Sequence, residues 1–264
     1  MPPERPRIGF AATAALGTDL LERLAAQHEI AFVLTQPDAP AGRGRGLRPT
    51  PAKLTALARG IPVVESLDEP LDAETIVLVA YGRLIPRELL ERHLWLNVHP
   101  SLLPRWRGAA PVERAIMAGD TETGVTIIKL VEELDAGPIA AQRSFPIGPE
   151  DDAGAVYDRS AEIGAELLEQ VLPAPTFTPQ PESGVTYAEK LTPADRELDW
   201  SRPAEELERQ VRALSPHIGA RAVLDGRELT LWRARVEDGK LVPVEVQPAG
   251  RRRMSYEEWQ RGLR

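Results

Sequence analysis

The N-terminal part of the chain alternates short apolar runs with segments whose apolar residues recur at helical spacing. The runs with the length of a strand are Arg7–Phe10, Glu29–Thr35, Pro62–Val64, Thr75–Ala80, Leu94–Val98 and Val125–Val131. The segments predicted to be helical are Thr18–Gln27, Thr50–Arg59, Pro86–Arg92, Pro111–Ala118 and Gly154–Val171. Strands that alternate with helices predict an open, mostly parallel α/β sheet.

The pattern changes after this region. Leu172–Ser183 has four prolines in twelve residues, a composition that resists both helix and sheet. After a helical stretch at Pro203–Arg212, three short strands are predicted, separated by Asp-Gly turn signals: Ala220–Leu224, Glu228–Val236 and Lys240–Val246. We therefore expect a first domain over residues 1–171, a linker over 172–199, and a small antiparallel β domain, a barrel, over 200–264.

Composition narrows the class of protein. With 42% hydrophobic and 27% charged residues, the chain has the balance of a soluble globular protein. No apolar run approaches the roughly 18 residues that span a bilayer, and no signal peptide is recognisable, so we expect a cytoplasmic protein with no membrane partner. The absence of cysteine excludes disulfides, thiolate metal sites and a cysteine nucleophile. The four histidines are far apart in sequence, and no metal is expected.

The charge is unevenly distributed. The net charge of −8 and the pI near 5.2 argue against a generally basic surface that coats nucleic acid. The acidic excess, however, lies almost wholly in residues 1–184, and the nearly neutral tail contains the cluster Arg251, Arg252 and Arg253. This division suggests two units with different roles, in which any nucleic-acid contact depends on local patches.

Asn97 and His99 are the first candidates for chemistry. They lie two residues apart at the end of a predicted strand, so alternation places both side chains on one face. Ligands of α/β proteins bind at this carboxyl end of the sheet. An amide donor beside an imidazole suits a tetrahedral oxyanion, and Pro100 and Pro104 stiffen the following loop. The alternative is a structural histidine with satisfied hydrogen bonds.

Asp135 follows another predicted strand, on the turn within Val131–Pro138. Such Asp-x-Gly turns are commonly structural, and this interpretation remains the alternative. If the carboxylate meets His99, it favours the imidazolium form and can relay protons.

Two arginine-bearing segments are candidates for anion contact. The loop Gln36–Leu47 carries Arg43 and Arg45 between glycines, but it lacks the spacing of a dinucleotide fingerprint. Arginines on glycine hinges can meet phosphates, and the Arg251–Arg253 cluster can contact a nucleic-acid backbone in the same way. A flexible surface loop and a solvated turn are the corresponding alternatives.

At these residues the chain resembles the methionyl-tRNA formyltransferases, a family of folate-dependent formyltransferases, over nearly its whole length. The motifs that carry the resemblance are Thr35–Asp38, Ala41–Gly44, Val79–Pro86, Asn97–Pro104, Arg107–Pro111, Thr123–Thr126, Leu134–Gly137, Tyr187–Leu191 and Gln247–Gly250. The Asn-x-His…Leu-Leu-Pro and Leu-Asp-x-Gly motifs are shared by all folate-dependent formyltransferases and indicate the chemistry only. The other motifs point to the tRNA enzymes.

The resemblance implies a Rossmann-like catalytic domain, a Pro-rich linker and a C-terminal domain similar to an OB-fold barrel. It implies formyl transfer from 10-formyltetrahydrofolate to initiator methionyl-tRNA, with Asn97, His99 and Asp135 as the catalytic trio. By position, the implied folate-binding residues are Val79, Ala80, Tyr81, Gly82, Leu84, Ser101, Leu102, Leu103 and Pro104. The implied tRNA-binding residues are Arg43, Arg45, Arg251, Arg252 and Arg253. We expect a monomer.

The sequence departs from the family pattern in places. Phe10–Leu16 replaces the usual Phe-x-Gly-Thr-Pro, and the C-terminal domain ends early. The alternatives include formyltransferases acting on glycinamide ribonucleotide or on an amino-sugar nucleotide, and a formyltetrahydrofolate hydrolase. The C-terminal β domain counts against the ribonucleotide enzyme. A noncatalytic RNA-binding protein is the alternative from another class, and the presence of the whole trio counts against it.

Overall fold

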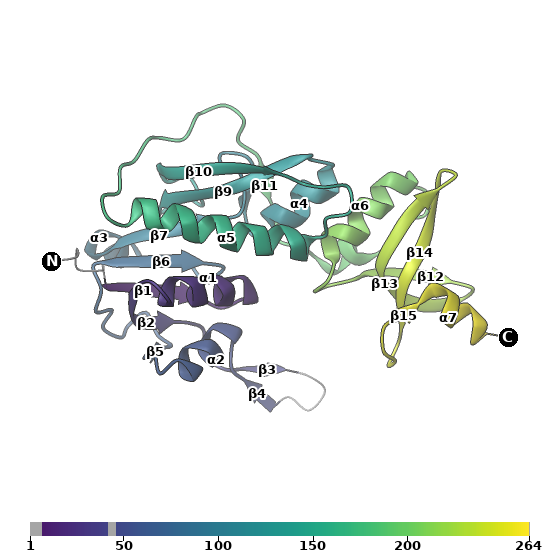
Figure 1. Ribbon diagram of the computed structural model, residues 1–264, viewed down its shortest axis with the longest axis horizontal. Coiled ribbons are helices and arrows are strands. Elements are labelled where there is room, and N and C mark those ends of the chain that lie inside the picture. The colour runs from purple at the N-terminus through teal and green to yellow at the C-terminus, as the bar shows by residue number, and fades with distance from the viewer. Residues whose placement is uncertain (1–6, 42–45, 264) are drawn as a thin grey trace. The chain divides into compact units, whose positions relative to one another are not determined.

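A seven-stranded sheet, in the order β10-β9-β7-β6-β1-β2-β5, forms the core of the N-terminal region in the computed structural model, which describes residues 7–41 and 46–263 (Figure 1). Its strands are β1 (Arg7–Ala12), β2 (Glu29–Leu34), β5 (Val63–Val64), β6 (Thr75–Val79), β7 (Leu94–His99), β9 (Glu122–Lys129) and β10 (Ile139–Pro146). The pairings from β5 through β2, β1 and β6 to β7 are parallel, and β9 is antiparallel to β7. The predicted open, mostly parallel α/β sheet is therefore confirmed.

Helices and one hairpin connect these strands. They are α1 (Ala15–Ala25), α2 (Pro51–Ala58), α3 (Arg87–Arg92), α4 (Pro111–Ala118) and α5 (Ala153–Val171), with the hairpin strands β3 (Ala39–Ala41) and β4 (Gly46–Arg48). Helix α1 buries Leu20, Leu21 and Leu24, the residues whose helical spacing predicted it. Helix α2 begins where the Thr50 hydroxyl accepts the Lys53 N–H. Within the described part of the chain, no helix is long and apolar enough to cross a membrane.

Strand β7 carries two of the candidate residues on one face of the sheet, because successive side chains of a strand point to opposite faces. Trp95 is buried in the apolar cluster of one sheet face, and its indole N–H donates to the Leu89 carbonyl of α3. Asn97 and His99 follow at steps of two, so they share the face of Trp95. In the antiparallel register with β9, His99 lies opposite Thr126. The end of β7 therefore presents polar side chains where the apolar cluster ends.

The C-terminal residues form an antiparallel sheet. Its strands β12 (Ala220–Leu224), β13 (Arg227–Glu237), β14 (Lys240–Pro248) and β15 (Met254–Ser255) pair in that order, with helices α6 (Ala204–Leu214) and α7 (Tyr256–Arg261). Both Asp-Gly pairs have positive φ at both residues, as tight hairpin turns require. A barrel closes when its first and last strands pair, whereas β12 and β15 are the two edges of this sheet. The antiparallel sheet is confirmed, and the barrel stays a prediction.

The chain folds into two compact units, each assembled from segments that are not continuous in sequence. One unit holds the chain up to Arg107 with Gly124–Ser144 and Asp158–Thr186. The other holds Gly108–Thr123, Phe145–Tyr157 and the chain from Tyr187 onward. The predicted linker contains β11 (Tyr187–Ala188), which pairs with β8 (Arg107–Gly108), and the 3-10 helix η1 (Pro193–Arg196). The boundaries at 171/172 and 199/200 stay a prediction.

Candidate active site

Asn97, His99 and Asp135 lie together at the end of β7. The Asn97 side-chain amide donates to Asp135 Oδ1 at 3.2 Å, and His99 Nδ1 lies 3.7 Å from Asp135 Oδ2. All three residues are buried, with exposed fractions of 7%, 4% and 8%. Low exposure strengthens interactions among charged and polar groups, because little water screens them. The arrangement places an amide donor, an imidazole and a carboxylate within one small polar cluster.

The opposite edge of the His99 ring is held by the backbone. His99 Nε2 lies 2.8 Å from the Trp106 carbonyl oxygen. A carbonyl only accepts, so we infer that Nε2 carries a proton. Nδ1 is then the nitrogen that faces Asp135, and it can be neutral or protonated. This contact fixes the orientation of the ring with respect to the carboxylate.

The loop after β7, residues 101–104, is fixed by one threonine of β9. The Thr126 hydroxyl donates to the Ser101 carbonyl at 2.6 Å and accepts from the Leu103 N–H at 3.2 Å. Gln142 donates to the same hydroxyl and to the Leu103 carbonyl. The Ser101 side chain is fully buried and donates to the Arg105 carbonyl. The hydroxyl of Ser101 therefore shapes the loop rather than facing an open site.

The second predicted folate segment follows β6. Ala80 has φ of 47°, a left-handed conformation that ends the strand sharply. The Tyr81 carbonyl accepts from Thr13 Oγ1 and Gln36 Nε2, both at 2.8 Å. Gly82 is exposed. Leu84 is 80% exposed, whereas the Tyr81 ring is buried in the apolar cluster. Only the backbone and the exposed residues of this segment are placed to contact a ligand.

The candidate arginines differ in their surroundings. Arg43 and Arg45 lie outside the described residues. Arg251, Arg252 and Arg253 are exposed. Arg252 Nη2 lies 3.2 Å from Glu258 Oε1 and forms an ion pair with it. The guanidinium of Arg253 stacks on the Trp232 ring, with Cζ 3.4 Å from the ring centroid.

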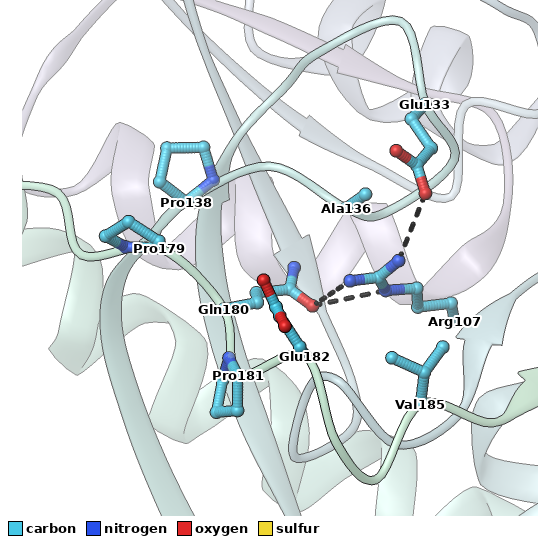
Figure 2. Close-up of a pocket in the computed structure, with 9 residues that line it drawn as sticks. All are labelled: Arg107, Glu133, Ala136, Pro138, Pro179, Gln180, Pro181, Glu182 and Val185. Carbon is cyan, nitrogen blue, oxygen red and sulfur yellow. Dashed lines mark hydrogen bonds and ion pairs between the residues drawn. The ribbon is translucent and has the colours of Figure 1, made fainter.

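A pocket of about 530 Å³ lies beside the Asp135 turn (Figure 2). Its lining residues are Arg107, Glu133, Ala136, Pro138, Pro179, Gln180, Pro181, Glu182 and Val185. Arg107 is buried and donates to the Gln180 side-chain oxygen, and it also pairs with Glu133 at 3.4 Å. Sequence reasoning did not single out Gln180, whose one local signal is an amide between two prolines.

The chain belongs to the formyl transferase family. Residues 10–172 match the formyl transferase domain, and residues 190–241 match the formyl transferase C-terminal domain. The match covers the end of β7 with Asn97 and His99, the turn with Asp135, and much of the C-terminal region.

Individual proteins similar to this chain include a curated relative and two solved structures. The chain is 47% identical over 246 residues to the methionyl-tRNA formyltransferase of Xanthomonas axonopodis pv. citri (strain 306), a match that covers 86% of this chain and 80% of that protein. The methionyl-tRNA formyltransferase from Clostridium thermocellum has a similar fold, with a TM-score of 0.66, 18% identity, and coverage of 92% and 98% of the two chains. WlaRD, a sugar 3N-formyl transferase solved in the presence of dTDP and 5-N-formyl-THF, also has this fold, with a TM-score of 0.67, 16% identity, and coverage of 88% and 87%.

Proposed function

We propose that this chain transfers the formyl group of 10-formyltetrahydrofolate to the α-amino group of initiator methionyl-tRNA, giving N-formylmethionyl-tRNA. The buried cluster of Asn97, His99 and Asp135 is the observation that carries the chemistry. The acceptor is supported by the curated methionyl-tRNA formyltransferases, which are 42–47% identical over most of the chain.

The reaction is a direct transfer. The neutral amine of the methionyl ester attacks the formyl carbon, the carbonyl oxygen becomes anionic, and the bond from that carbon to the folate N10 then breaks. The amine loses one proton and N10 gains one, so the atoms and charges balance. The barrier is lowered by donors that stabilise the transient oxyanion.

Asn97 supplies one of these donors. One hydrogen of its side-chain amide is directed to Asp135 Oδ1, and this contact orients the group. An amide has two N–H donors, so the second can bind the developing oxyanion. Its burial keeps the donor in place before the reaction, which is the condition for electrostatic stabilisation.

His99 and Asp135 supply the proton chemistry. Protonated at both nitrogens, His99 adds a positive charge near the oxyanion, and its Nδ1 faces the Asp135 carboxylate. The 3.7 Å between Nδ1 and Oδ2 exceeds a direct hydrogen bond, and a water molecule can bridge such a distance. We infer that a water beside Asp135 carries the proton from the amine to N10.

The two loops beside the cluster are the proposed folate site. The Ser101–Pro104 loop is fixed by Thr126 and Gln142, and the Val79–Leu84 segment is fixed through the Tyr81 carbonyl. The presence of 5-N-formyl-THF in the structure of WlaRD supports a folate co-substrate for this fold. Rigid backbone on both sides suits a planar ring system, because a preformed site loses little entropy on binding.

Binding of tRNA is assigned to local positive patches. The net charge of −8 makes the average field repel phosphate, so affinity depends on a few arginines. We propose Arg43 and Arg45 for the acceptor end, and Arg251, Arg252 and Arg253 for the tRNA backbone.

The test is an acceptor panel with 10-formyltetrahydrofolate as the donor. Methionyl initiator tRNA, glycinamide ribonucleotide, a dTDP-linked amino sugar and a reaction without acceptor are compared at equal enzyme concentration. We expect formyl transfer to the charged tRNA, with neither transfer to the other amines nor donor hydrolysis. Transfer to the sugar amine together with an inert charged tRNA would overturn the proposal.

A further inference from the structure

The segment Thr178–Thr186, here called the linker strap, lies within residues 172–199, the region predicted to be a linker. Thr178 forms two backbone hydrogen bonds with Ile139, the first residue of β10, at 2.7 and 2.9 Å. β10 is the edge strand of the seven-stranded sheet. The strap is therefore attached to the same unit that holds Asn97, His99 and Asp135.

Gln180 is the most fully bonded side chain of the strap. Its side-chain nitrogen donates to the Asp135 carbonyl at 2.7 Å and to the Gly137 carbonyl at 2.8 Å. Its side-chain oxygen accepts from Arg107 Nε at 3.2 Å and Nη2 at 2.9 Å (Figure 2). Both amide hydrogens are thus directed at the turn that carries the candidate carboxylate, and a buried arginine holds the amide in that orientation.

The Asp135 turn needs such support because its backbone is strained. Asp135 has φ of 48°, in the left-handed region that non-glycine residues rarely adopt. Two residues later, a Cβ atom at Gly137 would overlap the carbonyl oxygen of Lys129, so the turn approaches β9 closely. A strained backbone conformation is kept only when several surrounding contacts hold it in place. The two hydrogen bonds from Gln180 are such contacts.

The other end of the strap supports His99. Thr186 Oγ1 accepts the Trp106 N–H at 2.9 Å, and the Thr186 carbonyl accepts the Arg107 N–H at 2.9 Å. Trp106 also has a left-handed backbone, with φ of 63°, and its carbonyl is the partner of His99 Nε2. Thr186 therefore holds the backbone that orients the imidazole.

We infer that the linker strap is part of the catalytic apparatus, with Gln180 as a positioning residue for Asp135 and Thr186 as a positioning residue for His99. This inference rests on the proposed function. The strap forms hydrogen bonds with the backbone of the Asp135 turn and with the backbone of Trp106. These two segments position His99 Nδ1 and Asp135 Oδ2, which lie 3.7 Å apart. Small misplacement of a catalytic group can lower a rate by about 10²-fold, so these contacts control turnover without touching the substrate.

The first test is Gln180→Glu. The carboxylate still accepts from Arg107, but it loses both donors and sets a negative charge against two carbonyls. We expect kcat to fall by about 10- to 100-fold while KM for both substrates changes by less than about twofold. The control is Gln27→Glu, the same change at an exposed glutamine after α1, and it should leave kcat unchanged. An unchanged kcat in Gln180→Glu would overturn the assignment.

Thr186→Val is the second variant. It has nearly the same shape and removes the acceptor for the Trp106 N–H, so we again expect lower kcat with unchanged KM. It carries the test if Gln180→Glu does not fold, as judged by its thermal melting. A wild-type kcat for Thr186→Val would overturn the role of Thr186.

A double-mutant cycle separates positioning from a general structural effect. If Gln180 acts through Asp135, then adding Gln180→Glu to Asp135→Asn should change the residual rate by less than about twofold. If the double variant instead lost activity by the product of the two single-variant factors, the inference would be overturned and the proposed function would be left intact. Full activity of Asp135→Asn alone would instead remove the catalytic role of Asp135 and this inference with it. No transfer to charged tRNA by the wild type would overturn the proposed function.

Discussion

The Asp135 carboxylate faces His99 Nδ1 across 3.7 Å while its other oxygen accepts the Asn97 amide at 3.2 Å. One carboxylate therefore organises both of the other polar groups of the cluster. The His99 separation is too long for a direct hydrogen bond, which suits a pair that exchanges protons through an intervening group. The Asn97 contact is short enough to fix the amide.

Asp135→Asn separates these two roles. The side-chain oxygen of asparagine can still accept from Asn97, but the negative charge next to His99 is lost. Because general acid–base groups typically contribute about 10²- to 10⁴-fold, we expect kcat to fall within this range with KM nearly unchanged. Single-turnover formylation rates measure this, with Asp158→Asn on exposed α5 surface as the control. A kcat near the wild-type value would remove Asp135 from the mechanism.

Tyr81→Phe should stabilise the protein. The hydroxyl of Tyr81 is buried without a hydrogen-bond partner among the described residues, and burial raises its pKa above the usual value. An unpaired buried polar group costs about 1–3 kcal/mol, so its removal should raise the free energy of unfolding by about 1 kcal/mol. Urea unfolding measures the change, and Tyr187→Phe, at an exposed tyrosine, is the matched control. Destabilisation by Tyr81→Phe would show that the hydroxyl is paired.

Asp195→Asn should destabilise the protein in a pH-dependent way. Arg114 donates to Asp195 at 2.7 Å and, with Thr192, lowers the pKa of Asp195 from 3.8 to about 2. Because the pKa of Asp195 is lower in the folded state, its ionised form stabilises the fold fully at pH values above the unfolded-state pKa of 3.8. This stabilisation is lost as the pH falls from there through about 2.

We therefore expect Asp195→Asn to cost about 2 kcal/mol at pH 7 and about half of that at pH 3. Unfolding by urea at several pH values measures the difference from the wild type. A cost that grows on acidification would contradict the sign of this linkage.

Much of the fold follows from local patterns, and the exceptions have physical causes. The β-branched run at residues 75–80 predicted a buried strand, and the Asp-Gly pairs predicted the hairpins of the C-terminal sheet. β10 was missed because it is an edge strand in which only Phe145 is fully buried, so it shows no continuous apolar run. The barrel was expected from strand spacing alone, which does not determine whether the edges of a sheet pair.

The candidate site was predictable only in part. Asn97, His99 and Asp135 could be singled out because the first two lie at the end of a predicted strand and the third follows another, and Asn97 is also the only asparagine in the chain. Gln180 could not, because it acts on a backbone 45 residues away and lies among prolines that indicate a linker. Such roles depend on tertiary contacts, which no local pattern encodes.

Replacing Arg251 and Arg252 by glutamine should weaken tRNA binding. All three arginines of the cluster are exposed, and Arg252 forms an exposed ion pair with Glu258 that a phosphate can replace. Arg253 stacks on the Trp232 ring and donates to the Pro216 carbonyl, so we expect Arg251 and Arg252 to supply most of the phosphate contacts. Each lost contact should lower the slope of log affinity against log salt by about one. Filter binding of tRNA at several salt concentrations measures the slope, with Arg23→Gln on exposed α1 surface as the control. An unchanged slope would exclude this cluster from the interface.

The rate of formyl transfer to initiator methionyl-tRNA by Asn97→Ala, compared with the wild type under single-turnover conditions, tests the central claim most directly. Alanine removes the donor proposed for the oxyanion while the rest of the strand is unchanged. Loss of one such donor typically costs about 10²- to 10³-fold, and we expect a decrease of this size in a variant that melts as a folded protein. Near-normal transfer by folded Asn97→Ala would contradict the account.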